Sequence, residues 1–203
     1  MTNPGVDGSS VIELVGPGGA GKTTTGMALA ARLKSKFVDL DAEFMARNGD
    51  VSAFISRWGY EAYAARNVDT YLAIRNPSEP PGVMALSSGF MTYREDIHPV
   101  YAMSRQRIAS SALTFVLLPS LELDECVAEV VRRQLQRPFA RTPEREEQVI
   151  RSRFSVYANL SARKVVTRPA VPVVVEEIMA LLSTGGSDVN QRTRSGAEGV
   201  GTA

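Results

Sequence analysis

The sequence predicts a three-layer α/β fold built around a five-stranded parallel sheet. Short apolar runs alternate with longer segments of helical spacing along most of the chain. Strands separated by helices form parallel βαβ units with right-handed crossovers, so this order favours one open sheet with helices on both faces. The length of 203 residues, with 44% apolar and 22% charged residues, suits a single globular domain of ordinary size.

Five apolar runs are the expected strands. The first is followed directly by a glycine-rich turn, the third runs into small residues, and the fourth is closed by Pro119. Short runs with turn residues at their ends are typical of buried strands. In chain order they are 11–15 (VIELV), 37–41 (FVDLD), 82–89 (GVMALSSG), 113–119 (LTFVLLP) and 164–167 (KVVT).

The segments between these runs have apolar residues at helical spacing. Residues 22–35 end in basic side chains, as the C-terminus of a helix prefers. Residues 51–75 indicate two helices broken near Trp58 and Gly59. The expected helices lie at 22–35, 51–75, 122–134, 144–160 and 173–183.

The two ends of the chain differ in composition from the rest. Residues 1–10 are rich in Gly, Ser, Pro and Asn, and we expect a flexible leader. Residues 184–203 have almost no large apolar side chain, so they bury too little surface to offset their ordering entropy. We therefore expect a folded domain at 11–183 and a disordered polar tail at 184–203.

The overall charge is balanced. Lys and Arg number 23 against 22 Asp and Glu, which gives no reason to expect a nucleic acid or a membrane as partner. The single cysteine, Cys126, lies in an apolar helical stretch, where we expect it to be buried rather than reactive. No signal peptide pattern and no apolar run near the roughly 20 residues of a membrane span is visible. We expect a cytoplasmic protein and, although no pattern sets the oligomeric state, a monomer.

Residues 16–23 (GPGGAGKT) match the phosphate-binding loop pattern G-x-x-x-x-G-K-[ST]. A predicted strand precedes the match and a predicted helix follows it, which favours a real loop over an accidental glycine turn. Backbone N–H groups of such a loop bind phosphate at a helix N-terminus, the lysine reaches the β- and γ-phosphates, and the Thr23 hydroxyl binds Mg²⁺. The motif therefore predicts ATP and Mg²⁺ but no particular reaction. The expected contacts are Gly18, Gly19, Ala20, Gly21, Lys22, Thr23 and Thr24.

Two carboxylates, Asp39 and Asp41, stand at the end of the second predicted strand. In open α/β sheets ligands bind at that edge, and alternation along a strand would direct both side chains to the same side. One carboxylate would help to hold Mg²⁺ through water, and the other would accept a proton from a substrate hydroxyl. The alternative is a solvated D-x-D turn that caps the next helix.

The chain resembles the shikimate kinase family, whose members are P-loop kinases with a fold like that of nucleoside monophosphate kinases. The resemblance covers about 11–183, and its specific parts are the D-x-D strand and the late R-x-x-x-Y segment. It implies transfer of the γ-phosphoryl group of ATP to a hydroxyl of shikimate, giving shikimate 3-phosphate. The segments that carry it are GPGGAGKTTTGMALA (16–30), FVDLD (37–41) with Gly49, RWGYEAYAAR (57–66), VMALSSG (83–89), RRQLQRP (132–138) and RSRFSVYANLS (151–161).

On the acceptor side the resemblance implies three roles. Asp41 would orient or deprotonate the acceptor hydroxyl, and Asp39 would lie near Mg²⁺. Arg153 would pair with the substrate carboxylate, a task that suits the forked guanidinium.

On the donor side the resemblance implies a small lid at about 135–145 that closes over the site. Arg137 would be the lid arginine that covers the transferring phosphoryl group, and Arg132 or Arg133 would stack on adenine. The alternative is a solvated basic helix end, because arginines are plentiful in this region.

Two departures from the family concern the acceptor. The family has three glycines after its third strand, where this chain has Ser87, Ser88 and Gly89. Serine side chains there would narrow the substrate pocket or add hydroxyls, with Ser88 and Gly89 against the substrate. The family also has a second substrate arginine, where this chain has Ala64, and Arg66 lies about 200° further round the helix. A different cyclitol, sugar or sugar acid, or an ATP-binding regulatory module without transfer activity, therefore remain alternatives to shikimate phosphorylation.

Overall fold

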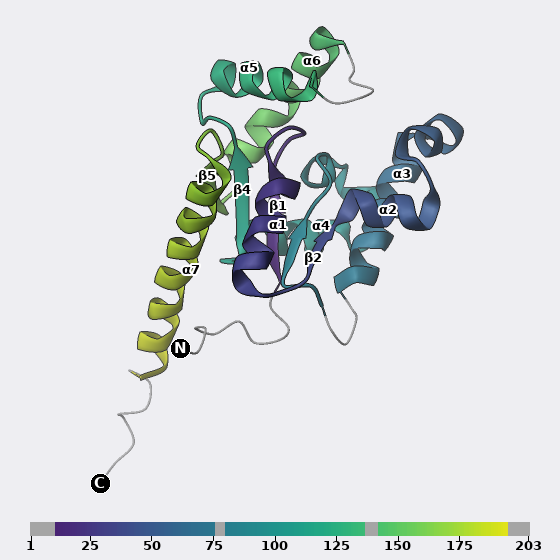
Figure 1. Ribbon diagram of the computed structural model, residues 1–203. Coiled ribbons are helices and arrows are strands. Elements are labelled where there is room, and N and C mark those ends of the chain that lie inside the picture. Colours follow the sequence, from purple (N-terminus) through teal and green to yellow (C-terminus); the bar gives the residue numbers. More distant parts are fainter. Residues whose placement is uncertain (1–10, 76–79, 137–141, 195–203) are drawn as a thin grey trace.

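The structure is a computed structural model, and it describes residues 11–75, 80–136 and 142–194, with side chains as far as Thr184. Five strands form one sheet in the order β2-β3-β1-β4-β5, and each neighbouring pair is parallel. Helices lie on both sides of this sheet (Figure 1). The predicted three-layer α/β fold is confirmed, whereas the expected leader, 1–10, lies outside the described residues.

The elements follow the predicted order, with additions between β2 and β4. The strands are β1 (Ile12–Val15), β2 (Phe37–Asp39), β3 (Val83–Ala85), β4 (Thr114–Leu118) and β5 (Arg163–Val166). The helices are α1 (Lys22–Leu33), α2 (Leu40–Asn48), α3 (Val51–Arg75), α4 (Tyr101–Ser110), α5 (Leu123–Gln134), α6 (Pro143–Ala158) and α7 (Val171–Arg194), with short 3₁₀ turns η1 (Phe90–Thr92) and η2 (Glu95–Ile97).

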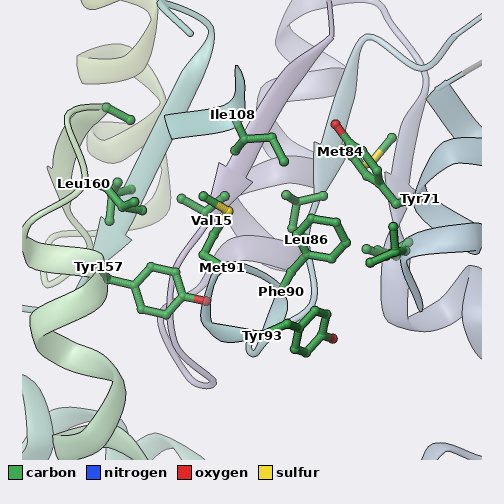
Figure 2. Close-up of a cluster of buried hydrophobic side chains, with 14 of the residues drawn as sticks. Val15, Tyr71, Met84, Leu86, Phe90, Met91, Tyr93, Ile108, Tyr157 and Leu160 are labelled. Carbon is green, nitrogen blue, oxygen red and sulfur yellow. The ribbon is translucent and has the colours of Figure 1, made fainter. Parts of the chain in front are cut away.

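The sheet separates two hydrophobic cores. Val15 of β1 faces the core that packs against α3, α4 and α6, and part of this core is drawn in Figure 2. Ile12 and Leu14 of the same strand face the other core, which α1 and α7 cover. Alternate residues of a strand point to opposite faces, so a strand buried on both sides must be apolar at nearly every position. This is why the central strands read as continuous apolar runs.

Glu13 is the exception within β1, because it is charged and yet only 1% exposed. It accepts hydrogen bonds from the Tyr71 hydroxyl at 2.6 Å and from Arg107 Nη2 at 2.9 Å. A buried carboxylate needs such partners, and removing one of them would leave an uncompensated charge. Glu13 therefore ties the central strand to α3 and α4.

The second strand is shorter than predicted, since α2 begins at Leu40. Asp39 is the N-cap of this helix, and its carboxylate accepts from the backbone N–H groups of Asp41 and Ala42. Aspartate is among the preferred N-cap residues, because its side chain satisfies N–H groups that have no partner within the helix. The expectation that Asp39 and Asp41 share one side of a strand is therefore wrong.

The last helix is longer than predicted. It reaches Arg194, so residues 184–194 are helical here rather than part of the disordered tail that we expected. Once a helix is nucleated, each further residue adds a hydrogen bond at little cost, and α7 is anchored by Val174 and Ile178 in the core under α1. Residues 195–203 lie outside the described part of the chain.

Two further features concern α3 and α4. The predicted break in 51–75 is confirmed at Gly59, which has φ 85° and ψ 163° inside α3. Trp58 beside it is 58% exposed and lies under the Arg57 guanidinium. Helix α4 was not predicted, because its buried stripe consists of Tyr101, Ser104 and Ile108 and is interrupted by a serine.

Cys126 is buried, as expected. Across the described ranges, no helix combines the length and apolar character that crossing a membrane requires.

Candidate active site

The phosphate-binding loop connects β1 to α1 at the carboxyl edge of the sheet. Gly16 has φ 147°, and a side chain there would collide with the backbone carbonyl of Leu117 in β4. Gly21 has φ 90° and is the N-cap of α1, without a side chain to bond the first-turn N–H groups. These N–H groups are where a helix N-terminus binds anions. The loop therefore has the conformation that its motif predicts.

Lys22, the first residue of α1, lies against this loop. Its Nζ donates to the carbonyl oxygens of Gly16 at 2.7 Å and Pro17 at 2.9 Å. Lys22 also lines a cavity of about 120 Å³ together with Thr23, Asp39 and Asp41. We refer to it as the transfer cavity. Its other lining residues are Gly18, Gly19, Gly21, Thr24, Leu86, Ser88 and Gln134.

Thr23 and Asp39 meet at one side of the transfer cavity. The Thr23 hydroxyl donates to Asp39 Oδ2 at 2.6 Å, while Asp39 Oδ1 caps α2. A hydroxyl and a carboxylate are the hard oxygen ligands that Mg²⁺ prefers, and Mg²⁺ commonly takes its remaining ligands from water and substrate phosphates. The described residues hold no cluster of three or more His, Cys, Asp or Glu that would suit an all-protein metal cage. Both predicted metal residues thus lie together, and their donor set fits Mg²⁺.

Asp41 lies in the first turn of α2. The Tyr63 hydroxyl lies 3.5 Å from its Oδ1. Burial raises the pKa of the Asp41 carboxyl, and this effect is opposed by a hydrogen bond from Ser87 and by the charge of Lys22. A raised pKa strengthens a carboxylate as a base, which suits a group that takes a proton from an alcohol. The start of a helix, and not strand alternation, brings Asp41 into the cavity with Asp39.

Ser87 lies beneath Asp41 and not in the transfer cavity. It is 2% exposed, and its Oγ accepts from the Nδ2 of the buried Asn67 at 2.8 Å. The same Asn67 nitrogen donates to the Tyr93 hydroxyl at 2.8 Å. Of the two serines that replace family glycines, Ser88 therefore borders the cavity, while Ser87 belongs to the support of the Asp41 carboxylate.

Arg153 of α6 approaches from the other side of the turn after β3. Its Nη1 lies 3.4 Å from Ser88 Oγ, and its Nη2 lies 3.4 Å from the hydroxyl of Tyr60. A side chain on Gly89 would lie within 2.8 Å of the Tyr60 hydroxyl and within 3.3 Å of Arg153 Nη2, so the glycine permits this close approach. Tyr157 fixes the turn by donating to the Ser88 carbonyl at 2.8 Å. The structure thus brings Arg153, Ser88 and Gly89 together, as the sequence predicts.

A buried alanine, Ala64, stands where the family has a second substrate arginine. Ala64 of α3 is 1% exposed and packs in the hydrophobic core. Arg66, the next basic residue, is exposed and pairs with Asp69 at 3.7 Å. Arg66 therefore does not replace the missing arginine, in agreement with its predicted direction.

A second cavity, of about 300 Å³, lies on the other side of the phosphate loop. Thr24 and Arg133 contribute to its polar part. Pro169, just before α7, and Val171 and Val174 of α7 contribute apolar side chains. This mixed lining of apolar side chains and hydrogen-bonding groups can bind a flat organic ring that carries polar atoms. We refer to it as the base cavity. Its remaining lining residues are Gly19, Gly21, Thr25, Thr167 and Ala170.

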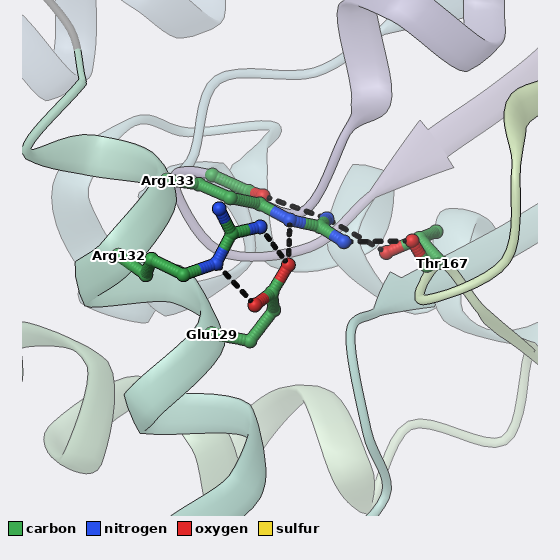
Figure 3. A network of polar contacts seen from close by, with 5 residues as sticks. Glu129, Arg132, Arg133 and Thr167 are labelled. Carbon is green, nitrogen blue, oxygen red and sulfur yellow. Dashed lines mark hydrogen bonds and ion pairs between the residues drawn. The ribbon is translucent and has the colours of Figure 1, made fainter.

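Arg133 is held in the wall of the base cavity by several contacts (Figure 3). Its guanidinium donates to the carbonyl oxygens of Thr167 at 2.8 Å and Gly19 at 3.3 Å, and to Glu129 at 2.7 Å. Arg132 pairs with the same carboxylate but is exposed and does not line this cavity. Arg133 is therefore the better placed of the two candidates for stacking on adenine. Arg137 lies outside the described residues, as does much of the expected lid, so their roles stay predictions.

Two residues of the site were missed by reasoning from the sequence. Tyr60 meets Arg153, and Gln134 at the end of α5 lines the transfer cavity. Both lie in segments that carry the family resemblance, 57–66 and 132–138, but the resemblance assigns neither a role, and their places follow from how α3 and α5 pack against the loops. Only the position of Gln134 directly after Arg133 hints at a role.

The sequence and the fold are both similar to those of known proteins. A model of the shikimate kinase family matches residues 18–189. A shikimate kinase of Nitratidesulfovibrio vulgaris is 32% identical over 177 residues, which is 84% of this chain and 94% of the relative. The chain belongs to the shikimate kinase family. It is a small-molecule kinase that transfers phosphoryl groups to an alcohol. A second member of the family, from Paramagnetospirillum magneticum, is 32% identical over 151 residues, covering 72% of this chain and 71% of that one.

Solved structures agree with the fold of this family. Shikimate kinase from Acinetobacter baumannii in complex with shikimate matches with a TM-score of 0.65 at 19% identity, over 87% of this chain and 96% of that one. A gluconokinase from Sinorhizobium meliloti matches with a TM-score of 0.53 at 16% identity, over 91% and 98% of the two chains. At such identities the likeness concerns the fold and not the acceptor.

Proposed function

We propose that this protein transfers the γ-phosphoryl group of ATP to the 3-hydroxyl of shikimate, with Mg²⁺ as cofactor. The observation that carries the proposal is the transfer cavity, in which the loop lysine Lys22 and the carboxylate of Asp41 share one small space. Ser88 borders the same space and contacts Arg153, which places a guanidinium at the far side of the acceptor turn. Membership of the shikimate kinase family makes shikimate the first acceptor to test.

The donor half of the reaction is positioned by the phosphate loop. Its backbone N–H groups and the Lys22 ammonium bind the β- and γ-phosphates, and they neutralise the charge that develops during transfer. Thr23 and Asp39 would hold Mg²⁺, which would supply positive charge to neutralise the phosphates. The base cavity takes adenine, with the Arg133 guanidinium against the ring. Thr24, at the start of α1, borders both cavities and contacts the nucleotide between them.

The acceptor half depends on Asp41 and Arg153. Arg153 pairs with the carboxylate of the acid and so turns its ring toward the loop, with Ser88 and Gly89 as the floor. The acceptor hydroxyl oxygen forms a bond to the γ-phosphorus as the bond from that phosphorus to the β,γ-bridging oxygen breaks. The hydroxyl proton passes to Asp41, and ADP leaves with the bridging oxygen.

One observation favours a different acceptor as the second candidate. The chain has Ala64 in its core where the family has a second substrate arginine, so a carboxylate at this site is bound with one guanidinium fewer. Ser88 adds a hydroxyl that can bond an acceptor hydroxyl. The alternative acceptor is therefore a sugar acid or a cyclitol, whose binding depends less on two arginines that pair with one carboxylate.

Coupled ADP release with Mg-ATP tests the proposal. The acceptors are shikimate, quinate, gluconate and an inositol, and the background is the rate without acceptor. We expect shikimate to give the highest kcat/KM of the panel. A higher kcat/KM with gluconate or an inositol would replace shikimate by the second candidate. Tight ATP binding with no acceptor-stimulated ADP release would favour a nucleotide-binding regulatory module instead.

A further inference from the structure

The last residue of α5, Gln134, covers the middle of the phosphate-binding loop. A methyl group placed on Gly18 would lie 2.6 Å from Gln134 Nε2, and one on Gly19 would lie 3.3 Å from Gln134 Cγ. The amide nitrogen thus neighbours Gly18, and the side-chain stem neighbours Gly19. A glycine pair at these positions makes room for the glutamine.

Gln134 faces the transfer cavity and not the base cavity. Gln134 and Gly18 line the transfer cavity together with Lys22, Asp41 and Ser88, whereas neither lines the base cavity. The acceptor base Asp41 marks the end of the loop at which the γ-phosphoryl group leaves ATP. The amide of Gln134 therefore lies at the γ-phosphate end of the nucleotide site.

Of the two ends of this amide, the nitrogen is the one that neighbours Gly18, which lines the transfer cavity. Gln134 Oε1 is buried and has no hydrogen-bond partner among the described residues. The nitrogen end carries two N–H donors and no lone pair to repel an anion, so it is complementary to phosphate oxygens. An amide is also neutral, so it binds the triphosphate without the large desolvation cost of another buried charge.

The neighbouring residues hold Gln134 in this place. Arg133, one position earlier, is anchored to the Gly19 and Thr167 carbonyls and to Glu129 (Figure 3). Because these contacts fix the last turn of α5 against the loop, Gln134 is pre-positioned at little further entropic cost. Preorganised donors of this kind contribute most where charge develops in a transition state.

We propose that Gln134 is a catalytic residue whose Nε2 donates a hydrogen bond to a γ-phosphate oxygen of ATP. This hydrogen bond becomes stronger as negative charge develops on that oxygen during transfer. This inference rests on the proposed kinase function. Because ADP has no γ-phosphate, the hydrogen bond from Gln134 raises the affinity for ATP and not the affinity for ADP. Gln134 adds to the loop a donor that comes from a separate element, the C-terminal end of α5.

The test compares Gln134→Met, which keeps the length of the side chain without a donor, with Gln134→Glu, which replaces the N–H₂ group by an anionic oxygen. Gln106→Glu, at an exposed position of α4, is the charge-matched control. Direct titration gives the Kd of ADP and of β,γ-imido-ATP, each with Mg²⁺. The coupled assay gives kcat with the best acceptor, and thermal unfolding shows that every variant is folded.

We expect Gln134→Met to lower kcat at least about 10-fold, since removing one transition-state donor costs about 100- to 1000-fold where it has been tested. It weakens the imido-ATP complex several-fold and changes the ADP Kd less than about 2-fold, because ADP has no γ-phosphate. Gln134→Glu lowers kcat further, through repulsion between the carboxylate and the phosphates, while Gln106→Glu matches the wild type.

Two results would overturn the proposal. One is an unchanged kcat and an unchanged ratio of the two Kd values in both Gln134 variants. The other is an equal loss of ADP and imido-ATP affinity, which would place the contact away from the γ-phosphate. The titrations need no acceptor, so they remain informative if the wild-type protein phosphorylates none of the panel. In that case the proposed function fails, and the γ-phosphate contact is judged by the two Kd values.

Discussion

The ion-pair cluster under the base cavity offers a quantitative test. Glu129 Oε1 accepts from Arg132 Nη2 and from Arg133 Nε, each at 2.7 Å, and its Oε2 accepts from Arg132 Nε at 2.8 Å. The hydrogen bond from Arg132, followed by that from Arg133, lowers the pKa of the Glu129 carboxyl from 4.5 to about 2. The substitution Glu129→Gln keeps the shape of the side chain and removes its charge.

The size of the effect follows from this pKa. At about 1.36 kcal/mol for each tenfold change in proton affinity, the difference sets a ceiling of about 3 kcal/mol on stabilisation. Arg132 is 59% exposed, and exposed ion pairs contribute only about 0.2–1 kcal/mol. We therefore expect Glu129→Gln to lower the free energy of unfolding by about 1–2 kcal/mol at neutral pH.

The pH dependence has a defined sign. A carboxyl whose pKa is lower in the folded state stabilises the protein above its unfolded pKa, near 4.5, and this contribution is lost as pH falls toward about 2. Urea unfolding of the wild type and of Glu129→Gln should therefore differ most at about pH 7, and the difference should shrink at about pH 3.5. Glu177→Gln, exposed on α7, is the matched control.

The same variant has a functional readout. With the Glu129 charge gone, Arg133 loses one of its anchors, so KM for ATP should rise several-fold while kcat changes little. A difference in unfolding free energy that is independent of pH, or absent, would refute the electrostatic account of this cluster. An unchanged KM for ATP would refute the link from Glu129 through Arg133 to the nucleotide.

Three further substitutions test other parts of the site and the fold. Asp41→Asn should lower kcat at least about 100-fold and leave ATP affinity nearly intact, because an amide cannot take the acceptor proton; equal turnover would remove Asp41 as the base. Arg153→Lys should raise KM for shikimate about 10-fold without changing KM for ATP, since a lysine cannot form the forked pair; an unchanged acceptor KM would place the carboxylate elsewhere. Gly26→Ala should destabilise the protein by about 1–3 kcal/mol in urea unfolding, because the new methyl group would collide with the Phe37 ring. A gain in stability, as the better helix propensity of alanine alone would give, would show that the core relaxes freely at this position.

The parts of the fold that could be predicted are those with a local signal. β1, β3 and β4 are buried on both faces and read as apolar runs, and the phosphate loop has a motif that sets its own conformation. The boundary after Asp39 could not be predicted from alternation, because a buried leucine such as Leu40 suits the end of a strand as well as the start of a helix. The choice is made by the side chain of Asp39, which caps α2.

The residues of the candidate site likewise fall into those that a local sequence signal predicts and those that only tertiary packing brings to the site. Lys22, Thr23 and Asp39 lie where β1 leads into α1 and β2 leads into α2, at the same edge of the sheet, so one motif and one strand end suffice to bring them together. Tyr60 and Gln134 reach the site only through tertiary packing, and their residue types occur equally in solvent-exposed positions. That Ser87 supports Asp41 from below was beyond the sequence, since it depends on Asn67 forming a buried hydrogen bond with Ser87.

The most direct test of the central claim follows the phosphorus atom itself. Wild-type protein is incubated with Mg-ATP labelled in the γ-phosphate and an excess of shikimate, and the products are separated and identified by ³¹P NMR. We predict one labelled product, phosphorylated at the 3-hydroxyl of shikimate, formed in equal amount to ADP. Label that appears only as inorganic phosphate, or that enters gluconate or an inositol in preference to shikimate when they compete, would contradict the account.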